Sequence, residues 1–236
     1  MSQSIVLPAR STHTATIVFL HGLGDVGESW ADALKDMQIA LPHVKIICPT
    51  APEQAVTINR GALMTSWHDI KSLAQIDDEG TAQFAGIEAS VAIVQSILDS
   101  EIRGGIPANR IVLGGFSQGA ALTVRTAFAG SVRLAGAVAL SGYLVQKTQL
   151  LASLALEANE EARKTPLFIG HGTADAVVSF EAGRRLHHAL SDAGVKAELH
   201  TYERMGHSSS AKEMRDLLEF FESVLPPDQQ EPKEQQ

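Results

Sequence analysis

The sequence predicts an α/β protein with a mostly parallel central sheet and helices on both of its faces. Short runs of β-branched and other apolar residues alternate along the chain with longer segments in which apolar residues recur every three or four positions. Because parallel strands need crossover connections, this alternation favours a parallel sheet. The chain has 236 residues, of which 44% are apolar, and no composition break divides it. We therefore expect one α/β domain over residues 1–227.

The first predicted unit is a strand, a glycine-rich loop and a helix. Residues 15–20 are apolar and run into the loop His21-Gly-Leu-Gly-Asp25. Apolar residues then recur at helical spacing, at Trp30, Leu34, Met37 and Leu41. A second strand is expected at residues 44–48.

The segment between residues 53 and 80 has no sustained helical pattern. Residues 55–57 and 62–67 are expected to pair as a hairpin around Asn59-Arg-Gly61. A stretch this long without regular elements is often a binding loop. Its apolar residues either line a binding surface or fasten the loop to the core, and the sequence leaves both open. They are Trp67, Ile70, Leu73 and Ile76.

The second half of the chain continues the alternation. Residues 78–103 read as one amphipathic helix ended by Gly104-Gly105, and a strand follows at 111–113. The other expected strands are 134–140, 166–170 and 196–202. The other expected helices are 120–126, 150–163, 180–193 and one that carries Met214, Leu217 and Phe221. Residues 228–236, rich in Gln, Glu and Pro, are expected to form a disordered tail.

Residues 115–119 read Gly-Phe-Ser-Gln-Gly and lie between a predicted strand and a predicted helix. A G-x-S-x-G pentapeptide in that context makes a nucleophile elbow, because two glycines without Cβ atoms allow a tight turn. Such a turn would hold Ser117 in a strained conformation with its hydroxyl exposed. A serine in a glycine-rich turn is otherwise a solvated turn residue or a helix N-cap. The assignment therefore depends on a base and an acid elsewhere.

Three loops at the ends of predicted strands carry Ser117, Asp175 and His207 in this order. Ligands bind at the carboxyl ends of strands in such sheets, and this is the chain order of an α/β-hydrolase. His207 would accept the serine proton, and Asp175 would orient the imidazole. Asp175 alone is otherwise a helix cap. His21 and His171 also follow strands, and we expect them to brace their loops, because only His207 follows the last strand.

Acyl transfer also requires donors for the developing oxyanion. The backbone N–H of Gln118 beside the elbow and that of Leu23 in the first glycine loop are the candidates. An isolated glycine-rich loop would be an ordinary turn, so Leu23 is a candidate only in the company of the three residues above.

Composition excludes several classes of function. The net charge is −8 and the 19 basic residues are scattered singly, which argues against a nucleic-acid groove or a polybasic lipid patch. Cys48 is the only cysteine, and neither a zinc spacing nor H-E-x-x-H is present, so we expect no metal and no cofactor. The start lacks a secretory signal and no stretch could span a bilayer. We expect a soluble protein of the cytoplasm, with the nucleus as an additional compartment.

Six separated motifs agree in order and spacing with those of one family. They are His21-Gly-Leu-Gly-Asp25, Ser66-Trp67 with Asp69, Gly104-Gly-Ile-Pro107 with Asn109-Arg110-Ile111, Gly114-Gly-Phe-Ser-Gln-Gly119, His171-Gly-Thr-Ala-Asp175 and Met205-Gly-His-Ser208. From about residue 17 to residue 227 the chain resembles the acyl-protein thioesterases of the phospholipase/carboxylesterase family. The motifs depart from the family at Ala120, where glycine is frequent, and at His68, where Phe is common, and His68 is expected to alter the acyl-binding surface.

The resemblance implies a function for these residues. Ser117 would be the nucleophile, Asp175 and His207 its partners, and the Leu23 and Gln118 amides the oxyanion hole. The substrates implied are S-acylated proteins, Gα subunits among them, from whose cysteines long fatty acyl groups such as palmitoyl would be released. Lysophospholipids would be weaker substrates, and contact with a membrane surface would be transient at most.

The acyl chain needs an apolar surface near Ser117. The best candidates for its wall are the apolar residues of the long loop, Trp67, Leu73 and Ile76.

Two other functions stay open at this stage. A broad carboxylesterase or lysophospholipase would use the same acyl-serine chemistry on a different substrate. A binding protein could keep the hydrolase fold without catalysis, although all three triad positions are filled.

Overall fold

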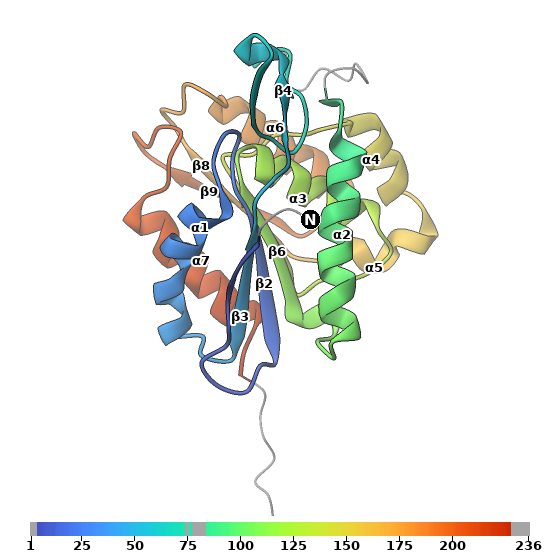
Figure 1. Cartoon of the computed structure of the whole chain (residues 1–236). Coiled ribbons are helices and arrows are strands. Elements are labelled where there is room, and N and C mark those ends of the chain that lie inside the picture. The colour runs from blue at the N-terminus through green and yellow to red at the C-terminus, as the bar shows by residue number, and fades with distance from the viewer. Residues whose placement is uncertain (1–3, 74–75, 77–83, 228–236) are drawn as a thin grey trace, which may run out of the picture.

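A seven-stranded sheet forms the centre of the computed structural model, which describes residues 4–73, 76 and 84–227 (Figure 1). The strand order is β1-β3-β2-β6-β7-β8-β9, and every neighbouring pair is parallel except β1 with β3. The prediction of a mostly parallel sheet is confirmed. The strands are β1 Ser4–Leu7, β2 Ala15–Leu20, β3 Val44–Pro49, β6 Ile111–Phe116, β7 Gly136–Leu140, β8 Leu167–Gly172 and β9 Ala197–Tyr202.

Helices cover both faces of this sheet, because alternate residues of each central strand point to opposite sides. Val18 and Leu20 of β2 join a core cluster with α2, α3, α4 and α6, whereas Ile17 and Phe19 join a second cluster with α1 and α7. The helices are α1 Gly27–Leu34, α2 Ile87–Arg103, α3 Gln118–Ala129, α4 Lys147–Leu154, α5 Glu160–Arg163, α6 Phe180–Asp192 and α7 Ala211–Val224. Among the described residues, no helix is long and apolar enough to cross a membrane.

The strand order places a switch point between β2 and β6. From β2 the chain moves outward to β3, and after α2 it returns to pair β6 with the other side of β2. At such a point the loops after the two neighbouring strands diverge and leave a crevice. The loops that carry Leu23 and Ser117 follow these two strands.

The structure differs from the sequence prediction at four elements, one of which was not expected at all. The edge strand β1 was not predicted, since its four residues carry no distinct pattern. Helix α2 begins at Ile87, after Gly86 at a φ of 91°, and residues 78–83 of the predicted helix lie outside the described part. The first helix ends at Leu34 and continues as a 3₁₀ turn, Lys35–Ile39. The predicted helix 150–163 is two helices, α4 and α5, with a 3₁₀ turn at Glu157–Asn159 before α5.

The predicted hairpin is present as β4 Glu53–Val56 and β5 Ala62–Thr65, paired antiparallel. Its turn contains Arg60 and Gly61, both at positive φ. The hairpin projects beyond the body of the molecule in Figure 1. Its base is fixed to the loop after β2, because Gly24 N–H donates to Thr65 O (2.8 Å) and Thr65 Oγ1 donates to Asp25 O (2.6 Å). It therefore stands beside the crevice.

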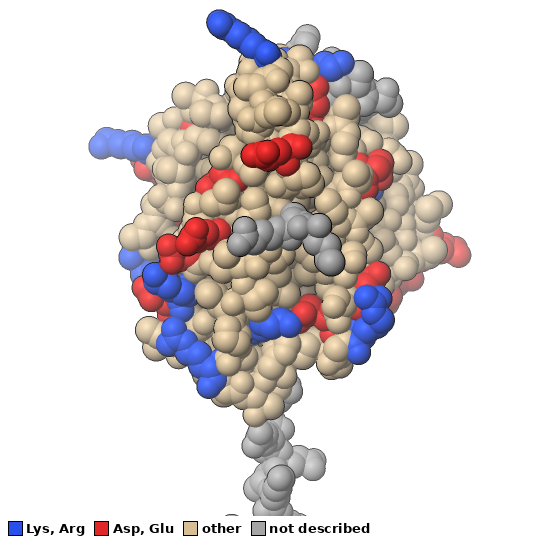
Figure 2. All heavy atoms as spheres, in the orientation of Figure 1, with Lys and Arg blue, Asp and Glu red and all other residues tan. Residues whose placement is uncertain are grey.

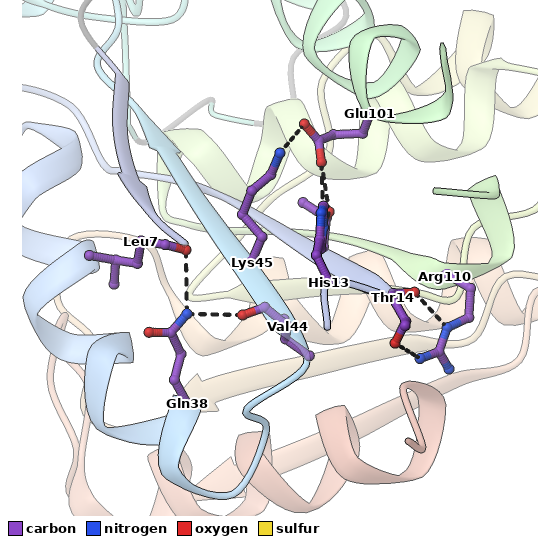
Figure 3. A network of polar contacts seen from close by, with 9 residues as sticks. Leu7, His13, Thr14, Gln38, Val44, Lys45, Glu101 and Arg110 are labelled. Atoms are coloured by element: carbon purple, nitrogen blue, oxygen red, sulfur yellow. Dashed lines mark hydrogen bonds and ion pairs between the residues drawn. The ribbon is translucent and has the colours of Figure 1, made fainter. Parts of the chain in front are cut away.

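A buried polar network lies near the amino-terminal ends of β2 and β3, at the end of the sheet away from Ser117 (Figure 3). Glu101 of α2 accepts hydrogen bonds from Thr16 Oγ1 (2.8 Å) and Lys45 Nζ (2.6 Å), and His13 Nε2 lies 2.9 Å from Thr16 Oγ1. Gln38 donates from Nε2 to the carbonyls of Leu7, Pro8 and Val44. These bonds join α2, β1, β2 and β3 at the end of the sheet that is remote from Ser117.

Candidate active site

The turn after β6 holds Ser117 in a strained conformation. Its φ is 54° and its ψ is −116°, outside the regions that non-glycine residues prefer, and α3 begins at the next residue. Glycines flank it for a steric reason. A Cβ on Gly115 would lie 2.4 Å from the Gly119 carbonyl carbon, and one on Gly119 would lie 2.3 Å from Leu20 O. Such strain, about 1–3 kcal/mol, is typical of functional sites.

The three residues predicted from the motif order lie in one hydrogen-bonded chain. His207 Nε2 is 2.9 Å from Ser117 Oγ, and His207 Nδ1 is 2.8 Å from Asp175 Oδ2. The residues come from three loops, after β6, β8 and β9. The geometry is that of a hydroxyl whose proton an imidazole can accept while a carboxylate holds the other ring nitrogen.

Asp175 has two separate tasks in its loop. Its Oδ1 accepts hydrogen bonds from the Val177 and Val178 amides, both at 2.9 Å, and Oδ2 is left to face His207. Burial alone would raise the pKa of Asp175, but the hydrogen bonds from His207 and the two amides outweigh burial and hold this pKa below its ordinary value. The carboxylate is therefore ionised near neutral pH. Ser179, and not Asp175, is the residue before α6.

His21 and His171 brace their loops, as expected. His21 Nδ1 lies 2.7 Å from Gly22 O, and its Nε2 accepts from the Ala51 amide at 2.9 Å. His171 Nε2 lies 2.9 Å from Val178 O and 3.5 Å from Asp175 Oδ2. Burial lowers the pKa of both imidazoles, so each stays neutral near pH 7.

Gln118 directly follows Ser117 after β6, and Leu23 lines the same cavity as Ser117, in the loop after the neighbouring strand β2. Gln118 is the first residue of α3, so its N–H precedes the first intrahelical bond. In the described part of the chain, the Leu23 N–H donates to no backbone carbonyl. Both donors are thus available to a ligand atom near Ser117.

A mainly apolar cavity of about 320 Å³ opens next to Ser117. Leu73 lies on its wall, as predicted. Trp67 and Ile76 do not, and this corrects the prediction: Trp67 is fully buried, Ile76 is 4% exposed, and both pack in the core. The other lining residues are Gly22, Leu23, Asp25, Ile58, Asn59, Ile70, Phe116, Tyr143, Val177, Val178 and His207.

Tyr143, Val177 and Val178 are cavity residues that the sequence reasoning missed. Tyr143 follows the Ser141-Gly142 exit of β7, and the two valines follow Asp175 after β8. The rule that ligands bind at the carboxyl ends of parallel strands was the signal that could have found them.

His68 lies behind the cavity wall and not on its surface. It is fully buried, its Nε2 is 3.2 Å from the Tyr143 hydroxyl, and its Nδ1 is 2.8 Å from Asp69 O. Burial lowers the pKa of His68 to about 4. Its influence on a bound acyl group would pass through Tyr143.

No cluster of three or more His, Cys, Asp or Glu residues that could hold a metal ion occurs among residues 4–73, 76 and 84–227. The site brings together a hydroxyl, an imidazole, an ionised carboxylate and two amide donors. This is the set of groups that acyl transfer through a serine requires.

Comparison with known proteins adds a family and several relatives. The model of a family described as Phospholipase/Carboxylesterase matches residues 1–225. Acyl-protein thioesterase 1 of Yarrowia lipolytica is 40% identical, over 94% of this chain and 97% of the relative. Acyl-protein thioesterase 1 homolog 1 of Dictyostelium discoideum is 38% identical, over 96% and 97%. The crystal structure of Zea mays acyl-protein thioesterase 2 is similar with a TM-score of 0.82 at 32% identity, over 95% and 100%.

Proposed function

The chain belongs to the phospholipase/carboxylesterase family of α/β-hydrolases, and we propose that it is a serine hydrolase that releases long-chain fatty acyl groups, palmitoyl among them, from S-acylated cysteines of proteins. The observation that carries this proposal is the hydrogen-bonded chain from Ser117 through His207 to Asp175 at the mouth of an apolar cavity. The relatives named acyl-protein thioesterase support the substrate class.

In the acylation half, Ser117 Oγ attacks the thioester carbonyl carbon while His207 Nε2 accepts the hydroxyl proton. The imidazolium is stabilised by the ionised Asp175. The tetrahedral intermediate then collapses, the C–S bond breaks, and His207 returns the proton to the departing cysteine sulfur. The products are an acyl-serine and a free thiol.

In the deacylation half, a water molecule takes the place of the thiol. His207 accepts its proton, the hydroxide oxygen attacks the acyl carbon, and the proton passes to Ser117 Oγ as the ester bond breaks. In both halves the carbonyl oxygen becomes an oxyanion, and the Leu23 and Gln118 amides donate to it. Donors fixed in this way contribute about 10²–10³-fold in rate each.

The cavity supports an apolar acyl group as the part of the substrate that is bound. Each buried CH₂ contributes about 0.8 kcal/mol, so a long chain gains more from such a wall than an acetyl group does. Leu73, Val177 and Val178 are among the aliphatic side chains that line the cavity. Among protein substrates the proposal includes Gα subunits, on the basis of family resemblance.

Transient contact with a membrane surface is part of the proposal, since S-acylated proteins reside there. Two exposed apolar residues, Leu73 and Val177, line the cavity. Val26 follows the lining residue Asp25, and Leu63 on the hairpin is 75% exposed. Lys and Arg side chains are spread apart over the face seen in Figure 2. We propose that the contact is made mainly by these apolar residues. The proposed location is the cytoplasm, with the nucleus in addition.

A broad carboxylesterase or lysophospholipase is the second candidate. The family description names both phospholipase and carboxylesterase, and either substrate passes through the same acyl-serine. A hydrolase-fold binding protein without catalysis is the third, and it would have no use for a base within 2.9 Å of a strained serine.

Two measurements test these candidates. A fluorophosphonate probe should form its adduct on Ser117 alone, and an adduct on another serine would refute the site. A palmitoyl-cysteine peptide, short-chain esters and a lysophospholipid are then compared by kcat/KM. The thioesterase proposal requires the highest value for the peptide, whereas no turnover of any of them would favour the binding protein.

A further inference from the structure

The side chain of Gln118 makes a set of hydrogen bonds that its backbone role does not need. It is fully buried. Its Oε1 accepts from the Trp67 amide at 2.7 Å, and its Nε2 donates to His68 O at 2.7 Å and to Ser66 Oγ at 3.0 Å. Three successive residues of the segment 66–68 are thus held by the side chain of the residue that follows the nucleophile.

The same segment holds the loop after β2. The Trp67 indole N–H donates to His21 O at 2.9 Å, and the His21 ring contacts the carbonyl of Gly22, the residue before Leu23. Its other nitrogen accepts from the Ala51 amide. A continuous path of hydrogen bonds therefore runs from Gln118 through Trp67 to the residues that precede Leu23.

We propose that the Gln118 side chain and Trp67 are positioning residues for the oxyanion hole, and that the segment 66–68 acts as a bridge between its two amides. The proposal rests on the proposed acyl-transfer function. The two amides come from different loops, and both must point to one oxygen atom at 2.7–3.1 Å. Hydrogen bonds fix direction as well as distance, which apolar packing alone does not, and an error of 1 Å costs about 10²-fold in rate.

A merely structural role would give a different outcome, and the chain offers a matched control. Gln38 is also a buried glutamine, 4% exposed, whose Nε2 donates to three backbone carbonyls at the other end of the sheet (Figure 3). Gln118→Met and Gln38→Met each remove one amide group of the same size. Both should lower the melting temperature.

The variants are compared on a short-chain ester, so the result does not depend on preference for a thioester. Gln118→Met should lower kcat about 10- to 100-fold with KM within a factor of two, since the defect appears where the oxyanion forms. Gln38→Met should leave both constants unchanged. Equal effects of the two variants on kcat, or none from Gln118→Met, would overturn the proposal. An inactive wild-type enzyme would instead overturn the proposed function on which it rests.

A second variant covers the case in which Gln118→Met does not fold. Gln118→Glu keeps the acceptor for the Trp67 amide, and its protonated form can still donate to His68 O. The ratio of variant to wild-type kcat should therefore rise as the pH is lowered, because the protonated carboxyl restores the lost donor. A ratio that is constant from pH 5 to 9, with kcat near wild type, would contradict a positioning role.

Trp67→Phe tests the other end of the bridge. It removes the indole N–H and keeps an aromatic ring in the core. We expect kcat to fall about 3- to 10-fold with KM unchanged, and we expect its combination with Gln118→Met to be less than additive, because both act on one path. Full additivity would mean that the two residues act separately and would remove the bridge from the proposal.

Discussion

The two ends of the central sheet each hold a hydroxyl, an imidazole and a carboxylate within hydrogen-bonding distance, yet in a different order. At the carboxyl end the imidazole is central: His207 lies between Ser117 and a carboxylate. At the amino end the hydroxyl is central, because Thr16 donates to Glu101 at 2.8 Å and His13 lies on its other side at 2.9 Å (Figure 3). The Thr16 proton is already held by a carboxylate, so the imidazole cannot remove it.

Access and backbone conformation separate the two clusters as well. Thr16 is fully buried within a regular strand, and Lys45 neutralises Glu101 at 2.6 Å. Ser117 lies at a positive φ, beside two available amides and a cavity. The comparison teaches that residue types and distances do not define a catalytic site. The order of donors and acceptors, and space for a substrate, are needed too.

The largest expected effect separates the two hydroxyls. Ser117→Ala should reduce turnover about 10⁶-fold, as removal of the nucleophile does in serine proteases, and should leave the fold intact. Thr16→Val should leave kcat unchanged and lower the free energy of unfolding by about 1–3 kcal/mol, because Glu101 loses a buried donor. Ester hydrolysis and urea unfolding of both variants check this. A Thr16→Val enzyme with a large loss of kcat would break the comparison.

The carboxylates should differ in the same sense. In Asp175→Asn, the carbonyl oxygen would keep the bonds to the Val177 and Val178 amides, and the amide nitrogen would face His207 Nδ1. The imidazole would then carry its proton on Nε2 and could not accept one from Ser117, so kcat should fall about 10⁴-fold.

Glu101→Gln is the control for that variant. It should cost about 1–3 kcal/mol of stability, since Lys45 loses its charged partner, and none of the activity. Steady-state kinetics of Asp175→Asn and Glu101→Gln measures the two effects on kcat, and thermal unfolding checks that both variants fold. Wild-type kcat in Asp175→Asn would mean that another carboxylate orients the base.

These comparisons also show how far the sequence could be interpreted. Ser117, Asp175 and His207 were predicted because each lies in a loop directly after a strand, where chain order alone restricts position. Trp67 was misplaced on the cavity wall, because an apolar residue in a long loop can face either way. The hydrogen bonds of the Gln118 side chain to the bridge of residues 66–68, and the network around Glu101, were not predicted at all. They depend on side chains that meet across distant segments, and no local pattern records such contacts.

The buried imidazole of His68 should make the catalytic end of the molecule sensitive to acid. Its pKa is about 4 in the folded protein against 6.5 in the unfolded chain, so the unfolded state binds the proton first. The contribution of neutral His68 to stability is full above pH 6.5, falls as the pH drops from 6.5 to 4, and changes no further below pH 4. The loss is about 3 kcal/mol, at roughly 1.4 kcal/mol per pKa unit.

His68→Phe should remove that part of the pH dependence, with urea unfolding at pH 7.5, 5 and 4 as the measurement. The control is His13→Phe at the amino end. The His13 side chain is 31% exposed. Burial and Lys45 lower its pKa, but Glu101, at 3.8 Å, acts in the opposite direction. His13→Phe should therefore change the pH dependence of stability less than His68→Phe does. An equal change in the two variants would show that burial of the imidazole does not distinguish the ends.

The smallest expected effect concerns the wall of the cavity. Of the three residues predicted for that wall, only Leu73 lines the cavity in the structure. Ile76 is not a suitable position for this test, because a charge at a residue that is 4% exposed would unfold the core. Leu73 is 36% exposed and lines the cavity next to Ser117. Ile102 is 37% exposed and lines a different cavity, at the carboxyl-terminal ends of α2 and α3. Leu73→Asp and Ile102→Asp therefore introduce the same charge at equally exposed aliphatic positions.

Leu73→Asp should raise KM for a palmitoyl thioester about 10-fold and KM for an acetyl ester less than 2-fold, because only the long chain loses its apolar contact with this wall. Ile102→Asp should change neither, and both variants should unfold within a few degrees of wild type. A chain-length series of substrates gives the sharpest reading, since the loss should grow with the number of carbons. Equal losses on long and short substrates would assign Leu73 to the support of the loop and would leave the acyl chain to the Val177 side of the cavity.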